Sequence, residues 1–194
     1  MLRLHTLALV LLALLCATAG ASANGFDPDK IPSIGSVAPA FGLPAFNAST
    51  SKDEAAGVVQ LDSLCGLRPG ETKGLLLVFV EAEQLESLEI ANTWHRRFSR
   101  QGLEILAISV DSKPVELASK VGRMHLRFPV LDDKHRIVAQ RYGVADTPFS
   151  MLLNRECRVL GFSSKTLAEV EEALTTSIEA LMAGQIGTPS GSMD

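Results

Sequence analysis

A run of six apolar residues, Leu75–Val80, is the feature that most constrains the fold of this chain. Six consecutive apolar positions are typical of a strand buried on both faces, which is the pattern of a central parallel strand. The residues that follow predict an amphipathic helix over residues 85–100. The apolar positions at helical spacing are Leu88, Ala91, Trp94 and Phe98. A strand that leads into a helix places free backbone N–H groups at a sheet edge, where many enzymes hold a reactive group.

The first residues have the three parts of a secretory signal peptide: Arg3, an apolar run over residues 7–15, and small residues that end at Ala23. The apolar run is too short to cross a bilayer as a permanent helix. We therefore expect cleavage after Ala23, no membrane anchor afterwards, and an exported protein in the periplasm or the extracellular space. A lipoprotein anchored at Cys16 is disfavoured, because Leu15 and not a small residue precedes this cysteine.

The remainder of the chain predicts one domain with short extensions. We expect a signal peptide over residues 1–23, an extended lead-in over 24–51, a domain over 52–183 and a flexible tail over 184–194. Three prolines, at positions 32, 39 and 44, should keep the lead-in extended and mostly out of ladder pairing. The formal net charge of −4 and the absence of a basic stripe argue against a nucleic-acid partner.

The order of the predicted elements is β-α-β-α, then a short helix, a β-hairpin and a closing helix. Strands are expected at residues 58–61, 74–80, 103–110, 128–131, 149–153 and 159–162. Helices are expected at residues 85–100, 114–121, 135–142 and 166–182. The parallel first half requires right-handed crossovers with helices on both faces of the sheet, and the hairpin adds antiparallel strands to it. The turn Asp132–Lys134 is expected to be solvated.

Five segments, in order and at compatible spacing, resemble the redoxin branch of the thioredoxin-like superfamily, which includes peroxiredoxins and exported thiol-disulfide oxidoreductases. They are Ile34–Leu43, Leu75–Ala82, Gly102–Asp111, Tyr142–Ser150 and Asn154–Glu156. The resemblance implies a thioredoxin-like α/β three-layer sandwich, with a mixed central sheet and helices on both faces. It also implies a cis peptide bond between Thr147 and Pro148.

The resemblance further implies a Cys-x-x-Cys pair, or one peroxidatic cysteine, a few residues after the central strand. The corresponding positions here are Gln84 and Ser87, and neither side chain can form a thiolate. The surrounding acidic residues are Glu81, Glu83, Glu86 and Glu89. Their charges would raise the pKa of a neighbouring thiol and suppress its reactivity. We therefore expect a redox-inactive site without a catalytic residue.

Cys65 and Cys157 are the cysteines that follow the expected cleavage site. In an oxidising compartment, two cysteines more often form one structural disulfide than two free thiols. In the resembled fold they would meet at the end of the sheet opposite Pro148, so we favour a structural disulfide. Two separate thiols and a catalytic pair are the alternatives.

The three histidines after the signal peptide give no metal-ligand spacing. They are His95, His125 and His135. A metal site made from acidic residues at the start of the helix is less favoured than solvated charges. We therefore predict neither a metal nor another cofactor.

These observations favour an exported thioredoxin-fold module that lacks thiol-disulfide and peroxidase activity and binds an extended peptide or an exported protein partner. The predicted groove residues are Glu83, Gln84, Ser87, Thr147, Pro148 and Phe149. The cis-proline could instead serve the fold alone. The rival functions are a thiol-dependent oxidoreductase or antioxidant protein that uses Cys65 or Cys157, and a metal-binding accessory protein.

Overall fold

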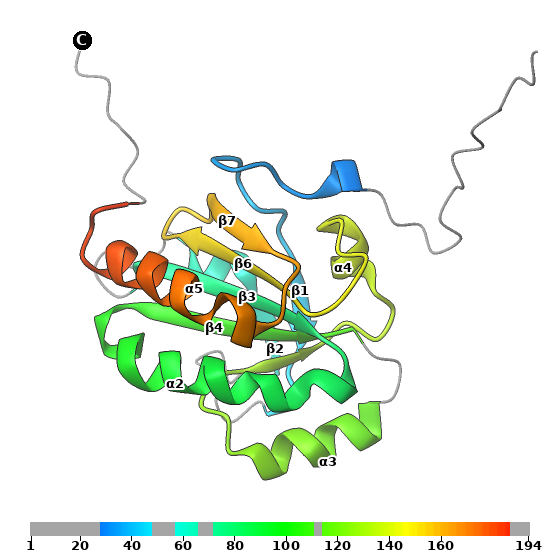
Figure 1. Cartoon of the computed structure of the whole chain (residues 1–194). Coiled ribbons are helices and arrows are strands. Elements are labelled where there is room, and N and C mark those ends of the chain that lie inside the picture. The colour runs from blue at the N-terminus through cyan, green and yellow to red at the C-terminus, as the bar shows by residue number, and fades with distance from the viewer. Residues whose placement is uncertain (1–27, 48–56, 66–71, 111–113, 187–194) are drawn as a thin grey trace, which may run out of the picture.

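A five-stranded mixed sheet forms the centre of the protein, in the strand order β5-β4-β3-β6-β7 (Figure 1). The computed structural model describes residues 28–47, 57–65, 72–110 and 114–186. The strands are β3 (Gly74–Val80), β4 (Leu103–Ser109), β5 (Val130–Asp132), β6 (Phe149–Asn154) and β7 (Val159–Ser163). Strand β3 is parallel to β4 and antiparallel to β6, as the element order predicts.

Strand β3 is buried along its whole length, which explains its continuous apolar sequence. Because side chains alternate across a strand, Leu75, Leu77 and Phe79 enter the core on one face of the sheet. The neighbouring residues Leu76, Val78 and Val80 enter the core on the other face. The sheet therefore separates two apolar layers, and each layer needs a cover.

Helices cover both faces of the sheet and complete a three-layer sandwich, which confirms the predicted fold class. One face carries α2 (Leu88–Phe98), α3 (Pro114–Met124) and α5 (Leu167–Met182). The other carries α1 (Leu61–Leu64), α4 (Ile137–Arg141) and the paired strands β1 (Gly42–Pro44) and β2 (Val58–Gln60). Figure 1 shows α2 and α5 side by side, and the Trp94 indole N–H donates to Thr175 Oγ1 between them at 2.8 Å.

The helix after β3 begins later than the prediction of residue 85. A 3₁₀ segment, η3 (Ala82–Ser87), comes first, and α2 starts at Leu88. The Gln84 N–H donates to the Glu81 carbonyl at 2.9 Å, which is the three-residue spacing of a 3₁₀ turn. After α2, a second 3₁₀ turn, η4 (Ser99–Gln101), leads to Gly102, whose φ of 106° ends the helix at the predicted glycine.

The prediction of a solvated turn at Asp132–Lys134 is wrong for Asp133, which is 2 % exposed. Its carboxylate accepts from the backbone N–H of Val138 at 3.2 Å and of Ala139 at 2.8 Å, the first turn of α4. Burial raises the pKa of the Asp133 carboxyl above its usual range, although these N–H donors lower it. Asp133 therefore holds the start of α4 against the sheet.

Other boundaries moved by a few residues. The short strand predicted at 128–131 is β5, two residues later at its start. The helix predicted at 135–142 is the shorter α4, because Arg136 adopts a left-handed φ of 55° just before it. Helix α3 continues to Met124, beyond the predicted residue 121. The edge strand predicted at 58–61 ends at Gln60, and α1 begins at the next residue.

The lead-in contributes more to the fold than expected. After a 3₁₀ turn, η1 (Pro28–Lys30), it reaches β1, which pairs with β2 in an antiparallel register despite the nearby prolines. Its residues Ala38, Phe41 and Leu43 are buried in the core. The predicted signal peptide and the tail beyond residue 186 lie outside the described residues. Within the described ranges, no helix is long and apolar enough to cross a membrane.

Candidate functional site

The end of β3 lies beside the loop that holds the cis-proline. The Thr147–Pro148 peptide bond is cis, as predicted. Phe79 pairs with Phe149 in the antiparallel register, so Pro148 stands next to the point where β3 passes into η3. The junction chosen from the sequence and the cis-proline loop are therefore neighbours in space.

The Gln84 carboxamide joins these two segments. Its Oε1 accepts a hydrogen bond from the Glu81 backbone N–H at 3.1 Å. Its Nε2 donates to the Thr147 carbonyl at 2.8 Å. Both ends of a neutral side chain are thus engaged, so Gln84 is a fixed hydrogen-bonding bridge and offers no nucleophile.

Arg136 makes a second link to the same loop. Its Nη1 donates to Glu81 Oε1 at 3.1 Å, and its Nη2 donates to the Ala145 carbonyl at 3.1 Å. The two side chains of this ion pair are 34 % and 41 % exposed, so the pair contributes at most about 1 kcal/mol. Its geometric role is clearer, because one guanidinium connects the end of β3 to the loop before Pro148.

These links line a polar cleft of about 560 Å³. The lining residues are Glu81, Gln84, Arg136, Gln140, Val144, Ala145, Asp146 and Thr147. They include carboxylates, amides and a guanidinium, but neither cysteine nor histidine. The arrangement suits hydrogen bonding to a polar ligand and does not provide a nucleophile with an adjacent base.

The structure brings together only part of the predicted groove. Gln84 and Thr147 meet, and Ser87 Oγ donates to the Gln84 carbonyl at 2.7 Å. Glu83 lines a different hollow, with Lys120 and Arg123 of α3.

Phe149, which was expected to contribute an apolar contact to the groove, lies in the core instead and is 3 % exposed. Its ring packs against Phe79 with centroids 6.0 Å apart and against Phe162 with centroids 5.9 Å apart. The register explains this position, because Phe149 is the first residue of β6 and faces the same layer as Phe79.

Sequence reasoning missed Arg136, Gln140 and Asp146. These residues lie in or near α4 and the loop after it, far along the chain from Glu81 and Gln84. No local pattern marks them, because their place in the cleft depends on how α4 packs beside the end of β3.

The two cysteines meet at the opposite end of the sheet. Cys65 and Cys157 form a disulfide with a Cα–Cα distance of 5.6 Å. Cys157 follows β6 in a turn, and Asn154 at the end of β6 pairs with Gly74 at the start of β3. The length of β3 therefore separates the disulfide from the cleft by roughly 20 Å, at about 3.3 Å per residue. This position agrees with the expected pairing.

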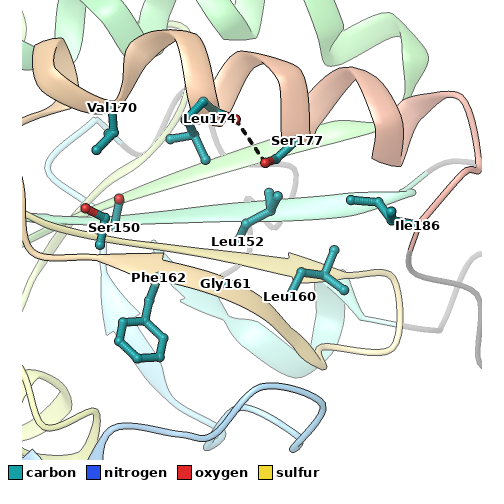
Figure 2. A pocket seen from close by; sticks show the side chains of 11 residues that line it. Ser150, Leu152, Leu160, Gly161, Phe162, Val170, Leu174, Ser177 and Ile186 are labelled. Atoms are coloured by element: carbon teal, nitrogen blue, oxygen red, sulfur yellow. Dashed lines mark hydrogen bonds between the residues drawn. The ribbon is translucent and has the colours of Figure 1, made fainter.

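A second hollow, of about 220 Å³, lies between α5 and the hairpin of β6 and β7. Figure 2 shows Val170 and Leu174 pointing from α5 toward Leu152 on β6. The rest of its lining is apolar or bears a serine hydroxyl, and none of it is charged. Acid–base or metal chemistry has no support there. In the described part of the chain, no three His, Cys, Asp or Glu side chains are grouped to hold a metal ion.

Comparison with known proteins gives the same family as the sequence motifs. The sequence profile of the AhpC/TSA family matches residues 34–161, about two thirds of the chain. The chain belongs to the AhpC/TSA family. The match begins inside the lead-in and ends in β7, so it includes the cleft, the cis-proline loop and both cysteines of the disulfide.

Similar curated proteins carry the name thiol-disulfide oxidoreductase ResA. The Bacillus subtilis protein is 29 % identical over 165 residues, which cover 82 % of this chain and 84 % of that one. The Bacillus anthracis protein is 29 % identical over 69 residues, or 36 % of this chain. The chain spans only 40 % of the length of the latter and of several other ResA relatives.

Solved structures share the fold at low sequence identity. A candidate thiol:disulfide interchange protein DsbE from Chlorobium tepidum has a TM-score of 0.65 and 23 % identity, covering 78 % of this chain and 99 % of that one. The reduced 2-Cys peroxiredoxin of Plasmodium vivax has a TM-score of 0.61 and 23 % identity, covering 82 % and 89 %. At such identities the likeness establishes the thioredoxin-like fold of this AhpC/TSA protein and nothing about its activity.

Proposed function

We propose that this AhpC/TSA-family protein is an exported binding or accessory module without thiol-disulfide or peroxidase activity at the cis-proline site. The observation that carries the proposal is the Gln84 bridge, which engages both ends of a carboxamide where the family resemblance implies a redox cysteine. Thiol exchange requires a thiolate as the attacking group. An amide that is bonded to the cis-proline loop cannot replace it.

The position of the disulfide supports the same proposal. Cys65 and Cys157 are bonded to each other at the far end of β3, and Cys157 is 4 % exposed. Reactive cysteines are usually partly exposed and lie in an electropositive environment that lowers their pKa. The Cys157 side chain lies inside the apolar cluster on one face of the sheet, while Arg155 and Arg158 of the same turn are exposed. This position suits a stabilising cross-link better than a catalytic thiol.

The polar cleft supports binding of a cationic ligand through the Asp146 carboxylate and not through the backbone carbonyls. The carbonyls of Ala145 and Thr147 already accept from Arg136 and Gln84. A peptide that added to Thr147 as a strand would have to displace the Gln84 amide. Among the described residues, the exposed Asp146 carboxylate of the cleft has no ion-pair partner, whereas Glu81 is paired with Arg136. We therefore assign to the cleft an extended peptide segment of a protein partner that bears lysine or arginine.

The loss of thiol chemistry is tested with the purified chain in two assays, reduction of insulin disulfides by dithiothreitol and consumption of hydrogen peroxide. We expect the rates to equal those without protein, because the site has no thiolate. The Cys65→Ser and Cys157→Ser variants should give the same background rates. Acceleration by the native protein that either substitution abolishes would instead establish the oxidoreductase that uses these cysteines.

The binding site is tested with two extended ten-residue peptides that differ only in carrying lysine or glutamate at alternate positions. We expect the lysine peptide to bind about two- to fivefold more tightly, since an exposed ion pair is worth up to about 1 kcal/mol. Asp146→Asn should remove this preference in fluorescence anisotropy. The matched control is Glu83→Gln, which removes the same charge from a different hollow and should leave the preference intact. Equal binding of both peptides, or equal effects of both substitutions, would refute the assignment of the cleft.

A further inference from the structure

Residues 31–41 cross the protein as a strap that is attached at three points. At the first point the strap pairs with the turn between β6 and β7. The Ala38 N–H donates to the Cys157 carbonyl at 2.8 Å, and the Gly35 N–H donates to the Val159 carbonyl at 2.8 Å. The Val159 N–H returns a bond to the Ser36 carbonyl at 3.0 Å. The strap is therefore hydrogen-bonded to the backbone of the disulfide residue Cys157 and of Val159, two residues later.

At the second point the strap lies on α4 and the residues that follow it. The Tyr142 hydroxyl donates to the Pro39 carbonyl at 2.8 Å. Ile31 sits directly on Gly143, where an added Cβ would come within 2.6 Å of the Ile31 nitrogen. Gly143 leads into Val144–Thr147, the loop that lines the cleft. The strap thus connects the disulfide end of the molecule to the element that precedes the cleft.

At the third point the strap meets α1, and the disulfide joins α1 to the hairpin turn. The strap ends at Phe41, whose carbonyl accepts from the Leu61 N–H at 3.0 Å at the start of α1. Helix α1 ends at Leu64, and the next residue, Cys65, is bonded to Cys157 on the hairpin. The strap, α1 and the hairpin turn therefore form a closed ring in which the disulfide is the covalent link.

The two sulfur atoms differ in accessibility, which determines how the ring can open. Cys65 is half-buried, whereas Cys157 is 4 % exposed and lies within an apolar cluster. A thiolate from solvent can therefore approach Cys65 more readily. The hairpin turn has its own support, because Asn154 Oδ1 accepts from the N–H groups of Glu156 at 3.0 Å and Arg158 at 2.8 Å. Opening the disulfide thus leaves the turn in place but breaks its covalent bond to the residue that follows α1.

We infer that the Cys65–Cys157 disulfide is a redox-sensitive clasp that keeps the strap docked on the hairpin turn and on α4. A dithiol opens it by attacking Cys65 Sγ, so that the S–S bond breaks and Cys157 leaves as a thiolate that takes up a proton. The second thiol of the reagent then displaces Cys65 from the mixed disulfide. Two electrons pass to the protein, and the dithiol becomes a disulfide. The ring of strap, α1 and hairpin turn is then open, while the central sheet stays folded.

Native-state hydrogen exchange tests the clasp on the full chain, oxidised or treated with dithiothreitol, with the thiol state checked by intact mass. The reporters are the amides of Gly35, Ala38 and Val159, compared with those of β3. We expect reduction to accelerate exchange at the reporters by at least about tenfold through local opening. The exchange rates of the β3 amides should rise only by the factor that the measured loss of global stability requires. Unchanged exchange rates at the reporters would overturn the proposal. An increase by one common factor at the reporters and at the β3 amides would overturn it as well.

The double variant Cys65→Ser/Cys157→Ser should reproduce the reduced pattern without any reagent. A matched control is Arg158→Ala, which removes the bond from Arg158 Nη1 to the Gly35 carbonyl at 2.9 Å but leaves the disulfide closed. In that variant, dithiothreitol should still accelerate the Ala38 amide at least about tenfold, as expected for local opening. A double variant whose strap keeps the protection of the oxidised protein would also overturn the clasp.

Discussion

Phe79→Ala is expected to lower the free energy of unfolding by about 3–5 kcal/mol, the range for removing a buried aromatic ring. Phe79 is fully buried, and its ring packs on Tyr142 with centroids 5.6 Å apart and on Phe149 with centroids 6.0 Å apart. These contacts join β3, β6 and the end of α4, which is the framework of the cleft. Alanine would leave a cavity that a sheet on one side and a strap on the other cannot close.

Urea unfolding followed by circular dichroism measures this effect, and Phe162→Ala is its control. Phe162 stacks on Phe149 with centroids 5.9 Å apart but is 46 % exposed. Because water already reaches much of its ring, we expect its removal to cost less than about 1.5 kcal/mol. Similar losses in the two variants would show that the aromatic cluster is not the energetic centre of this face.

Gly143→Ala is expected to destabilise the protein by about 2–4 kcal/mol, the sum of a left-handed backbone and an overpacked contact. Gly143 has a φ of 63°, and an added Cβ would lie 2.6 Å from the Ile31 nitrogen and 3.0 Å from the Lys30 carbonyl carbon. Both neighbours are backbone atoms, which cannot move aside as the end of a side chain can. The strap must therefore lift away from α4, or α4 must move away from the sheet.

Gly184→Ala separates the two contributions. Gly184 follows α5 as Gly143 follows α4, and its φ of 73° is similarly left-handed, but nothing lies within 4 Å of its added Cβ. We expect it to cost only the backbone term, about 1 kcal/mol. Urea unfolding of both variants gives the difference. Equal losses would mean that the strap does not press on Gly143.

Strands and helices with strong apolar periodicity were predictable from the sequence. Strand β3 has only apolar residues after Gly74, and α5 has its capping Thr166, so both lie where the pattern places them. The segment after β3 was less predictable, because Gln84 and Ser87 form a 3₁₀ turn and not the first turn of α2. Local helix propensity does not include the hydrogen bond to Thr147 that holds this turn.

The residues of the candidate site were likewise predictable only in part. The sequence indicated Gln84 and Thr147 because they belong to motifs that the family resemblance marks. It misplaced Phe149, since a residue beside a cis-proline can face the core or the surface depending on the register of β6. It also gave no sign of Arg136, which has a left-handed φ of 55° and lies between the buried Asp133, whose carboxylate caps α4, and α4 itself.

The amino-acid sequence by itself determined the buried central strand, the thioredoxin-like order of elements and the absence of a cysteine between residues 66 and 156. These properties are local or compositional, so one chain suffices to establish them. Only the tertiary structure decided that Gln84 bonds Thr147 across 63 residues and that Arg136 bonds Glu81 across 55. Such contacts depend on strand register and on the packing of α4, which bring together segments that no sequence period relates.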